Sequence, residues 1–126
     1  MAQNSNVFNI TLDQYASFYM TLQVTDSASV PVPIQSWSFT GSIKQQFTAV
    51  TPVTTFSIEI LDYSQSLVMF ALSPYETGLL KHPTYVYDII ATNILPDGKE
   101  QVYRVLEGTV TPTPGVTPSP VTDSIP

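Results

Sequence analysis

Residues 84–110, TYVYDIIATNILPDGKEQVYRVLEGTV, decide the fold. In the first half of this stretch, large apolar side chains recur at every second position. The second half alternates two sets of side chains, one of Val102, Arg104 and Leu106 and the other of Tyr103, Val105 and Glu107. A period of two is typical of an extended strand. Between the halves stands Asp97-Gly98, a dipeptide that readily adopts the positive φ angles of a tight turn. The stretch therefore predicts an antiparallel hairpin.

The same period recurs in the rest of the chain. Five further strands are predicted, at residues 7–12, 18–24, 37–43, 56–60 and 67–72. The last of these is a continuous apolar run, which fits a strand buried on both faces. Turn-forming prolines and polar clusters separate the strands. Seven short strands without a long helical period predict an all-β fold, an antiparallel immunoglobulin-like β-sandwich with Trp37 at the centre of its core.

One helical turn is expected between two of these strands. In the sequence Ser73-Pro74-Tyr75-Glu76, the serine can cap a helix and the proline suits the first helical position. The glutamate is placed to bond back to the capping residue, and Gly78 follows soon enough to end the helix.

The composition changes near the end of the sequence. Residues 111–126 contain five of the eleven prolines and no aromatic residue. We therefore predict a sandwich domain at residues 1–110 and an extended Pro/Thr-rich arm at residues 111–126. The arm is either disordered or ordered against a neighbouring subunit, and residues 1–6 are a second candidate contact arm. The candidate contact residues of the C-terminal arm are Pro112, Pro114, Val116, Val121 and Ile125.

The charge content argues against several classes of partner. Only 11% of residues are charged, with four basic and ten acidic side chains and a net charge of −6. Nucleic-acid binding is not expected, because phosphate contacts need clustered Lys or Arg. No disulfide is possible, since there is no cysteine. The first twenty residues hold no Lys or Arg, and no apolar run has the ~18 residues of a membrane helix, so neither a signal peptide nor a membrane partner is expected.

The sequence offers little for catalysis. His82 is the only histidine in the sequence. We interpret it as a solvated loop residue, because the sequence has no cysteine nucleophile and no serine or aspartate at a spacing that indicates a catalytic partner. Asp88, Glu100 and Glu107 offer carboxylate pairs of the kind that hydrolyse glycosides, but any two neighbouring strands offer such pairs by chance. We expect no catalytic residue, no metal ligand and no cofactor.

Three tyrosines form the remaining candidate site. Tyr85 and Tyr87 share one face of the first hairpin strand, and Tyr103 lies on the second. These rings could stack on a sugar, as in a carbohydrate-binding or adhesion module, or contact another protein. Packing into the core is the third interpretation, because tyrosine is commonly part-buried.

Four segments carry a resemblance to a known family. They are NVFNITLDQYASFYMTLQVTD at residues 6–26, PIQSWSFTGSIKQ at 33–45, SLVMFALSPYETGLL at 66–80 and PTYVYDIIATNILPDGKEQVYRVLEGTVTPTPGVT at 83–117. In this order they resemble small virion proteins of tailed bacteriophages and the N-terminal domains of some phage baseplate proteins. The end of the last segment, LEGTVTPTPGVT at residues 106–117, is the most specific part of the likeness.

The resemblance implies a building block of a phage particle. The expected fold is an immunoglobulin-like sandwich, and the expected role is a non-enzymatic adaptor or accessory subunit of the neck, tail or baseplate. The alternative role is decoration of the capsid. The implied partners are other virion proteins (portal or neck, tail or capsid subunits) in a symmetric multi-copy assembly, and the implied location is the virion, assembled in the host cytoplasm.

Overall fold

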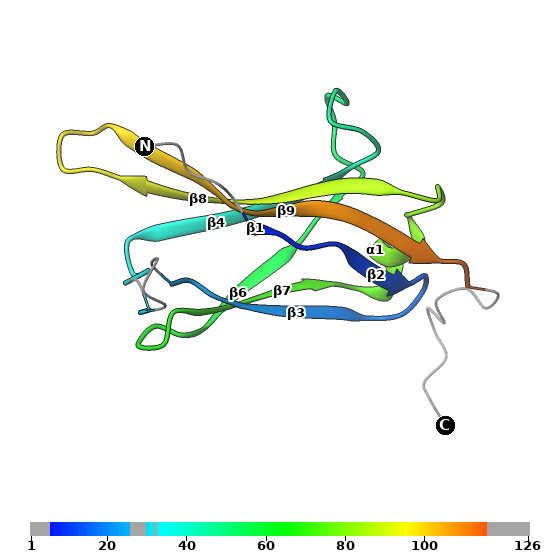
Figure 1. Cartoon of the computed structure of the whole chain (residues 1–126), viewed down its shortest axis with the longest axis horizontal. Coiled ribbons are helices and arrows are strands. Elements are labelled where there is room, and N and C mark those ends of the chain that lie inside the picture. The colour runs from blue at the N-terminus through cyan, green and yellow to red at the C-terminus, as the bar shows by residue number, and fades with distance from the viewer. Residues whose placement is uncertain (1–5, 26–29, 32, 116–126) are drawn as a thin grey trace.

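The computed structural model describes residues 6–25, 30–31 and 33–115. Within these residues the chain is mostly β, with two facing sheets and one short helix (Figure 1). The sequence therefore predicts the secondary-structure class correctly. The pairing of the strands is not purely antiparallel, because the first two strands pair in parallel with the last one.

The larger sheet has the order β1-β9-β8-β4-β5, and β2 also pairs with β9, beyond β1. Its strands are β1 (Asn6–Val7), β2 (Ile10–Asp13), β4 (Trp37–Lys44), β5 (Thr54–Thr55), β8 (Tyr85–Ile94) and β9 (Glu100–Thr113). The smaller sheet has the order β3-β7-β6. Its strands are β3 (Phe18–Gln23), β6 (Ser57–Asp62) and β7 (Leu67–Leu72). Six of the seven predicted strand regions are confirmed, whereas the predicted opening strand at residues 7–12 is divided into β1 and β2, and the short β5 was not predicted.

The predicted hairpin is confirmed as β8 and β9, which pair antiparallel along nearly their whole length. At its turn Gly98 has a φ of 88°, and its N–H donates to the carbonyl of Leu95 at 2.8 Å. The carboxylate of Asp97 accepts from the N–H of Lys99 at 3.0 Å. Asp and Gly thus fill the positions of a three-residue loop that ends in a left-handed glycine.

The opening strand corrects the prediction of an antiparallel sheet. Both β1 and β2 pair with β9 in parallel, so the sheet is mixed. Local periodicity carries no information on this point, because about a hundred residues separate the two partners and a connection of that length permits either direction.

The core lies between the two sheets. Among the described residues fourteen buried apolar side chains form this core, including Ile43 and Ile89 of the larger sheet and Val68 and Phe70 of the smaller one. Trp37 is only partly buried and packs against the margin of this core, beside the ring of Tyr103 at 5.6 Å. The prediction that Trp37 forms the centre is therefore wrong. The tryptophan is the first residue of β4, whereas the buried residues of that strand, Gly41 and Ile43, lie further along it.

The apolar run in β7 is also interpreted differently. Its burial alternates, with Val68, Phe70 and Leu72 buried and Leu67, Met69 and Ala71 only half-buried on the outer face. The prediction of a strand buried on both faces is wrong, since β7 is the middle strand of a three-stranded sheet with one face toward the core.

Strand β9 extends past the predicted start of the arm. It runs to Thr113, and Pro112 is buried opposite Leu12 of β2. Proline has no N–H, and here none is needed. The nitrogen of Pro112 faces the side of β8, which begins opposite Val110 and so offers no carbonyl at the level of Pro112. The first residues of the predicted arm therefore belong to the sheet. Residues 116–126 lie outside the described residues.

The short helix α1 (Pro74–Gly78) has the predicted capping box. The Ser73 hydroxyl accepts from the N–H of Glu76 at 3.2 Å, and the Glu76 carboxylate accepts from the N–H of Ser73 at 2.7 Å.

Replacing the capping serine should lower stability measurably. We expect Ser73→Ala to cost about 1 kcal/mol in the free energy of unfolding, because it removes an N-cap acceptor. Urea unfolding followed by circular dichroism measures this. Ser73→Asp, which keeps an acceptor, should retain most of the stability, and equal losses in both variants would contradict the capping role.

Candidate functional site

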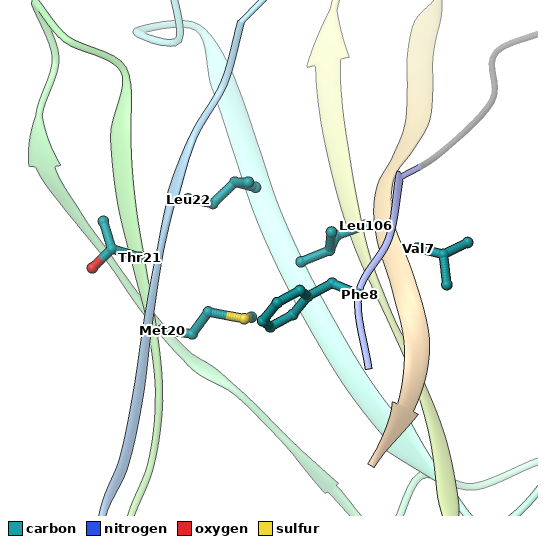
Figure 2. Close-up of a pocket in the computed structure, with 6 residues that line it drawn as sticks. All are labelled: Val7, Phe8, Met20, Thr21, Leu22 and Leu106. Atoms are coloured by element: carbon teal, nitrogen blue, oxygen red, sulfur yellow. The ribbon is translucent and has the colours of Figure 1, made fainter. Parts of the chain in front are cut away.

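An apolar groove lies where the two sheets leave one side of the sandwich open. It has a volume of about 250 Å³ and is lined by Val7, Phe8, Met20, Thr21, Leu22 and Leu106. Figure 2 shows Phe8 and Met20 pointing toward each other from opposite walls, with Leu22 and Leu106 above them. In the same view Val7 and Thr21 point away from the groove. Phe8 is 52% exposed.

The wall that carries Phe8 is shaped by a break between β1 and β2. The Phe8 N–H donates to the Glu107 carbonyl at 2.8 Å, and the Phe8 carbonyl accepts from the Tyr87 hydroxyl at 2.6 Å. Gly108 lies directly under this carbonyl, where a Cβ atom would overlap it. The absence of a side chain at Gly108 therefore lets the buried tyrosine reach the edge of the sheet and fix Phe8 beside the groove.

The opposite wall is β3, which has a pairing partner on one side only. The Val24 N–H donates to the Ser66 carbonyl at 3.0 Å, which continues the β3–β7 ladder. Since backbone groups alternate between the two edges of a strand, the N–H and C=O groups of Tyr19, Thr21 and Gln23 point away from β7. No strand among the described residues pairs with them. Six residues of β3 thus form an open edge next to the groove.

The end of β9 is fixed to the loop that precedes β3. The side chain of Gln14 accepts from the Gly115 N–H at 3.0 Å and donates to the Leu80 carbonyl at 2.5 Å. The ring of Tyr15 packs against Gly78 and Gly115, and its hydroxyl is 2.6 Å from Lys81 Nζ. Gly115, the last described residue, is therefore held at the end of the sandwich where β3 begins.

The structure does not bring the three candidate tyrosines to the surface. Tyr85 and Tyr87 are buried in the core, 1% and 2% exposed. Tyr103 is half-buried on the same inner face, against Trp37. The expectation that these rings form an exposed platform or contact face is wrong for Tyr85 and Tyr87, because the alternation of β8 directs them between the sheets. Core packing, one of the three interpretations, is correct for these two rings, whereas Tyr103 keeps part of its surface exposed.

The Tyr87 phenol is therefore a buried titratable group. Burial raises the pKa of Tyr87 from its ordinary value of 10.0 to about 12. At neutral pH the Tyr87 hydroxyl keeps its proton and donates it in the hydrogen bond to the Phe8 carbonyl.

The candidate contact residues of the arm divide into two groups. Pro112 is buried inside the sheet, and Pro114 is exposed just after β9 ends. Val116, Val121 and Ile125 lie outside the described residues.

Charged side chains form local contacts without a reactive arrangement. Arg104 Nε lies 3.2 Å from Asp88, and its Nη1 lies 3.8 Å from Glu107, on the outer face of the larger sheet. Asp62 accepts hydrogen bonds from the Ser64 side chain and then from the backbone of Gln65 and Ser64, which lowers the pKa of Asp62. His82 is exposed, with its ring 5.9 Å from that of Tyr85. Among the described residues no three His, Cys, Asp or Glu side chains gather as a metal site.

No family model and no curated protein matches this chain. In the part of the chain that the structure describes, no helix is long and apolar enough to cross a membrane.

Sequence reasoning missed the groove because its residues are predicted only as strand residues. One signal was present at the start of the chain. Val7 and Phe8 are consecutive apolar residues, which breaks the period of two, so both cannot face the core of a regular strand. The structure exposes both, 70% and 52%.

Proposed function

We propose that this protein is a non-enzymatic structural subunit of a bacteriophage virion, an adaptor or accessory protein of the neck, tail or baseplate. It docks by protein–protein contacts in a symmetric, multi-copy assembly. The resemblance of four sequence segments to small virion proteins of tailed phages is the reason for placing it in a phage particle.

One structural observation supports docking. An apolar groove lies beside six residues of unpaired strand edge, a combination that binds an extended polypeptide through both backbone and side chains. The outer face of the larger sheet adds exposed apolar side chains, Ile94 at 59% and Val102 at 54%. With so few charges, such a surface can be covered at a small desolvation cost.

We also propose that the sandwich is of the immunoglobulin-like class. Two observations support this. The strands β3, β7 and β6 follow the B-E-D order of that fold, and β4, β8 and β9 follow its C-F-G order. In addition, Tyr85 stands at the start of β8, and its hydroxyl accepts from the backbone N–H of His82 three residues upstream at 2.9 Å, as in a tyrosine corner.

The composition of purified particles tests the proposed role. Virions of a phage that encodes this chain should contain it in a fixed copy number, measured by quantitative mass spectrometry. A small number typical of a ring supports the neck, tail or baseplate, and hundreds of copies would support capsid decoration instead. Absence from mature particles would refute the proposal.

The arm gives a more specific prediction. Because β9 continues to Thr113 and Gly115 is bound by Gln14, a truncation should begin at residue 116. Deleting residues 116–126 should leave the thermal midpoint of the domain nearly unchanged but reduce its incorporation into particles at least tenfold. Incorporation at the full level would show that the arm has no part in docking.

A further inference from the structure

The groove and the open edge of β3 are adjacent, which makes them one slot for an extended segment. A strand that pairs with Tyr19, Thr21 and Gln23 lies alongside Met20 and Leu22, whose side chains point into the groove. The β1 wall offers less backbone, since it is two residues long and its neighbouring Phe8 carbonyl is already bonded to Tyr87. A segment that enters the slot is therefore expected to pair with β3.

The prolines at the end of the sequence are all separated by even numbers of residues. Pro112, Pro114, Pro118, Pro120 and Pro126 all occupy even positions. In an extended strand, successive N–H groups point to opposite edges. One edge of such a strand is interrupted by proline, whereas the other keeps every N–H donor, from Thr117 through Ile125. This pattern is suited to a strand that pairs on one side only.

The described part of β9 already follows this pattern. The odd-numbered carbonyls of Glu107 and Thr113 accept from Phe8 and Gln14, so the odd edge faces β1 and β2. The even edge faces β8, which ends before Pro112 is reached. The same rule that accommodates Pro112 in the sheet thus continues through the sequence to residue 126.

We propose that residues 116–126 of one copy add as a strand to the β3 edge of a second copy and cover its groove. Eleven extended residues span about 35 Å, and six residues of β3 span about 20 Å, so the segment is long enough to cross between copies and pair. This inference rests on the proposed structural role and identifies the segment that would bind in the slot, the C-terminal residues of a second copy.

The geometry at Gly115 favours a second copy over the same chain. Strands β2 and β9 end at the same end of the sandwich where β3 begins (Figure 1). Pairing with its own β3 would require the chain to turn back. A Pro-Gly pair makes such a reversal with a positive φ at glycine, and Gly115 does not have one. A head-to-tail contact of this kind closes into a ring when its rotation allows.

Self-association of the purified full chain tests this inference, with two matched pairs of variants. Thr21→Pro removes an outward N–H from β3 without removing a bond to β7, and Thr21→Ala is its control. Thr117→Pro interrupts the intact edge of the segment, and Thr122→Pro makes the same substitution on the edge that already carries prolines. In sedimentation between 10 µM and 1 mM, Thr21→Pro and Thr117→Pro should weaken association at least tenfold, and both controls should stay within twofold of the native chain.

Cysteine cross-linking locates the contact, because the chain has no cysteine of its own. A mixture of Met20→Cys and Val121→Cys should form a cross-linked pair of chains on oxidation. Thr40→Cys, on the exposed outer face of the larger sheet, should not cross-link to Val121→Cys.

Three results would overturn the inference. They are a monomeric native chain at 1 mM, equal effects of the two arm prolines, and a Met20→Cys/Val121→Cys double variant that cross-links only within one chain. Incorporation into particles without self-association would overturn the strand addition and leave the proposed structural role standing.

Discussion

Gly108→Ala should destabilise the protein by about 3 kcal/mol and open the groove. The added methyl group would overlap the carbonyl oxygen of Phe8 and would also lie 2.9 Å from the Asn9 side chain. Both atoms belong to Phe8 and Asn9, the two residues between β1 and β2, which the Tyr87 hydroxyl holds in place through the Phe8 carbonyl, so the nearby β1 must move away from β9. Overpacking and the lost hydrogen bond each contribute on the order of 1–2 kcal/mol.

Urea unfolding of the variant measures the loss, and hydrogen exchange at Phe8 locates it. Gly98→Ala is the matched control, since a Cβ there meets open space and only the positive φ of 88° is strained. The control should lose about 1 kcal/mol and keep the exchange protection of Phe8. A Gly108→Ala variant as stable as the native chain would show that β1 is not fixed by the contact between Phe8 and β9.

Tyr87→Phe should change the pH dependence of stability as well as its size. Near pH 8 we expect the variant to be about 1 kcal/mol less stable, because the hydrogen bond to the Phe8 carbonyl is lost. Above about pH 11 the order should reverse. The raised pKa of about 12 keeps Tyr87 protonated in the folded state, while the unfolded chain loses the same proton near pH 10.

The sign follows from which state holds the proton. Between pH 10 and 12 the folded state binds more protons, so the stability of the native chain falls as the pH rises. A pKa raised from 10.0 to about 12 corresponds to at most about 2–3 kcal/mol, and screening by solvent reduces it, but the phenylalanine variant does not share this loss. Urea unfolding at pH 8 and at pH 11.5, followed by Trp37 fluorescence, should show the two stability curves crossing. A constant difference across this range would show that Tyr87 is not a buried donor.

Much of the architecture could be predicted from local patterns. The period of two identifies most strand regions, although not the short β5, and the Asp97-Gly98 turn identifies the pairing of β8 with β9. The capping box at Ser73 is equally local, because all of its bonds lie within four residues. These features depend on neighbouring residues alone, which is why one sequence suffices for them.

The missed features depend on distant partners. Whether β2 runs parallel to β9, and whether Tyr87 points at a sugar or at the carbonyl of Phe8, is decided by segments about eighty to a hundred residues away. Periodicity shows that the Tyr85 and Tyr87 rings share a face, but it does not show which face is inside. The groove is missed for the same reason, since its two walls come from strands of different sheets.

In addition, the side chains of β9 do not alternate strictly between the two faces of the sheet, because the hairpin contains one irregularity in its pairing. The pairing of β8 with β9 shifts between Ile89 and Ile90, where Ile89 is opposite Leu106 and Ile90 is opposite Arg104. Val105 is therefore an extra residue, a β-bulge, and packs against the core together with Leu106. The sequence pattern places Arg104 on the same face as Leu106, whereas the structure places it on the outer face, paired with Asp88.

The bulge gives the hairpin unequal tolerance to changes in chain length. Residues inserted at the tip, near Gly98, extend a loop in open space and leave both strands in register. Removing the single residue Val105 would instead turn the outer half of β9 over, so that Arg104 faced inward and Tyr103 left Trp37 for solvent. A lineage of such chains is therefore free to vary in length at the tip of this hairpin, while its residue count between Tyr103 and Leu106 stays fixed.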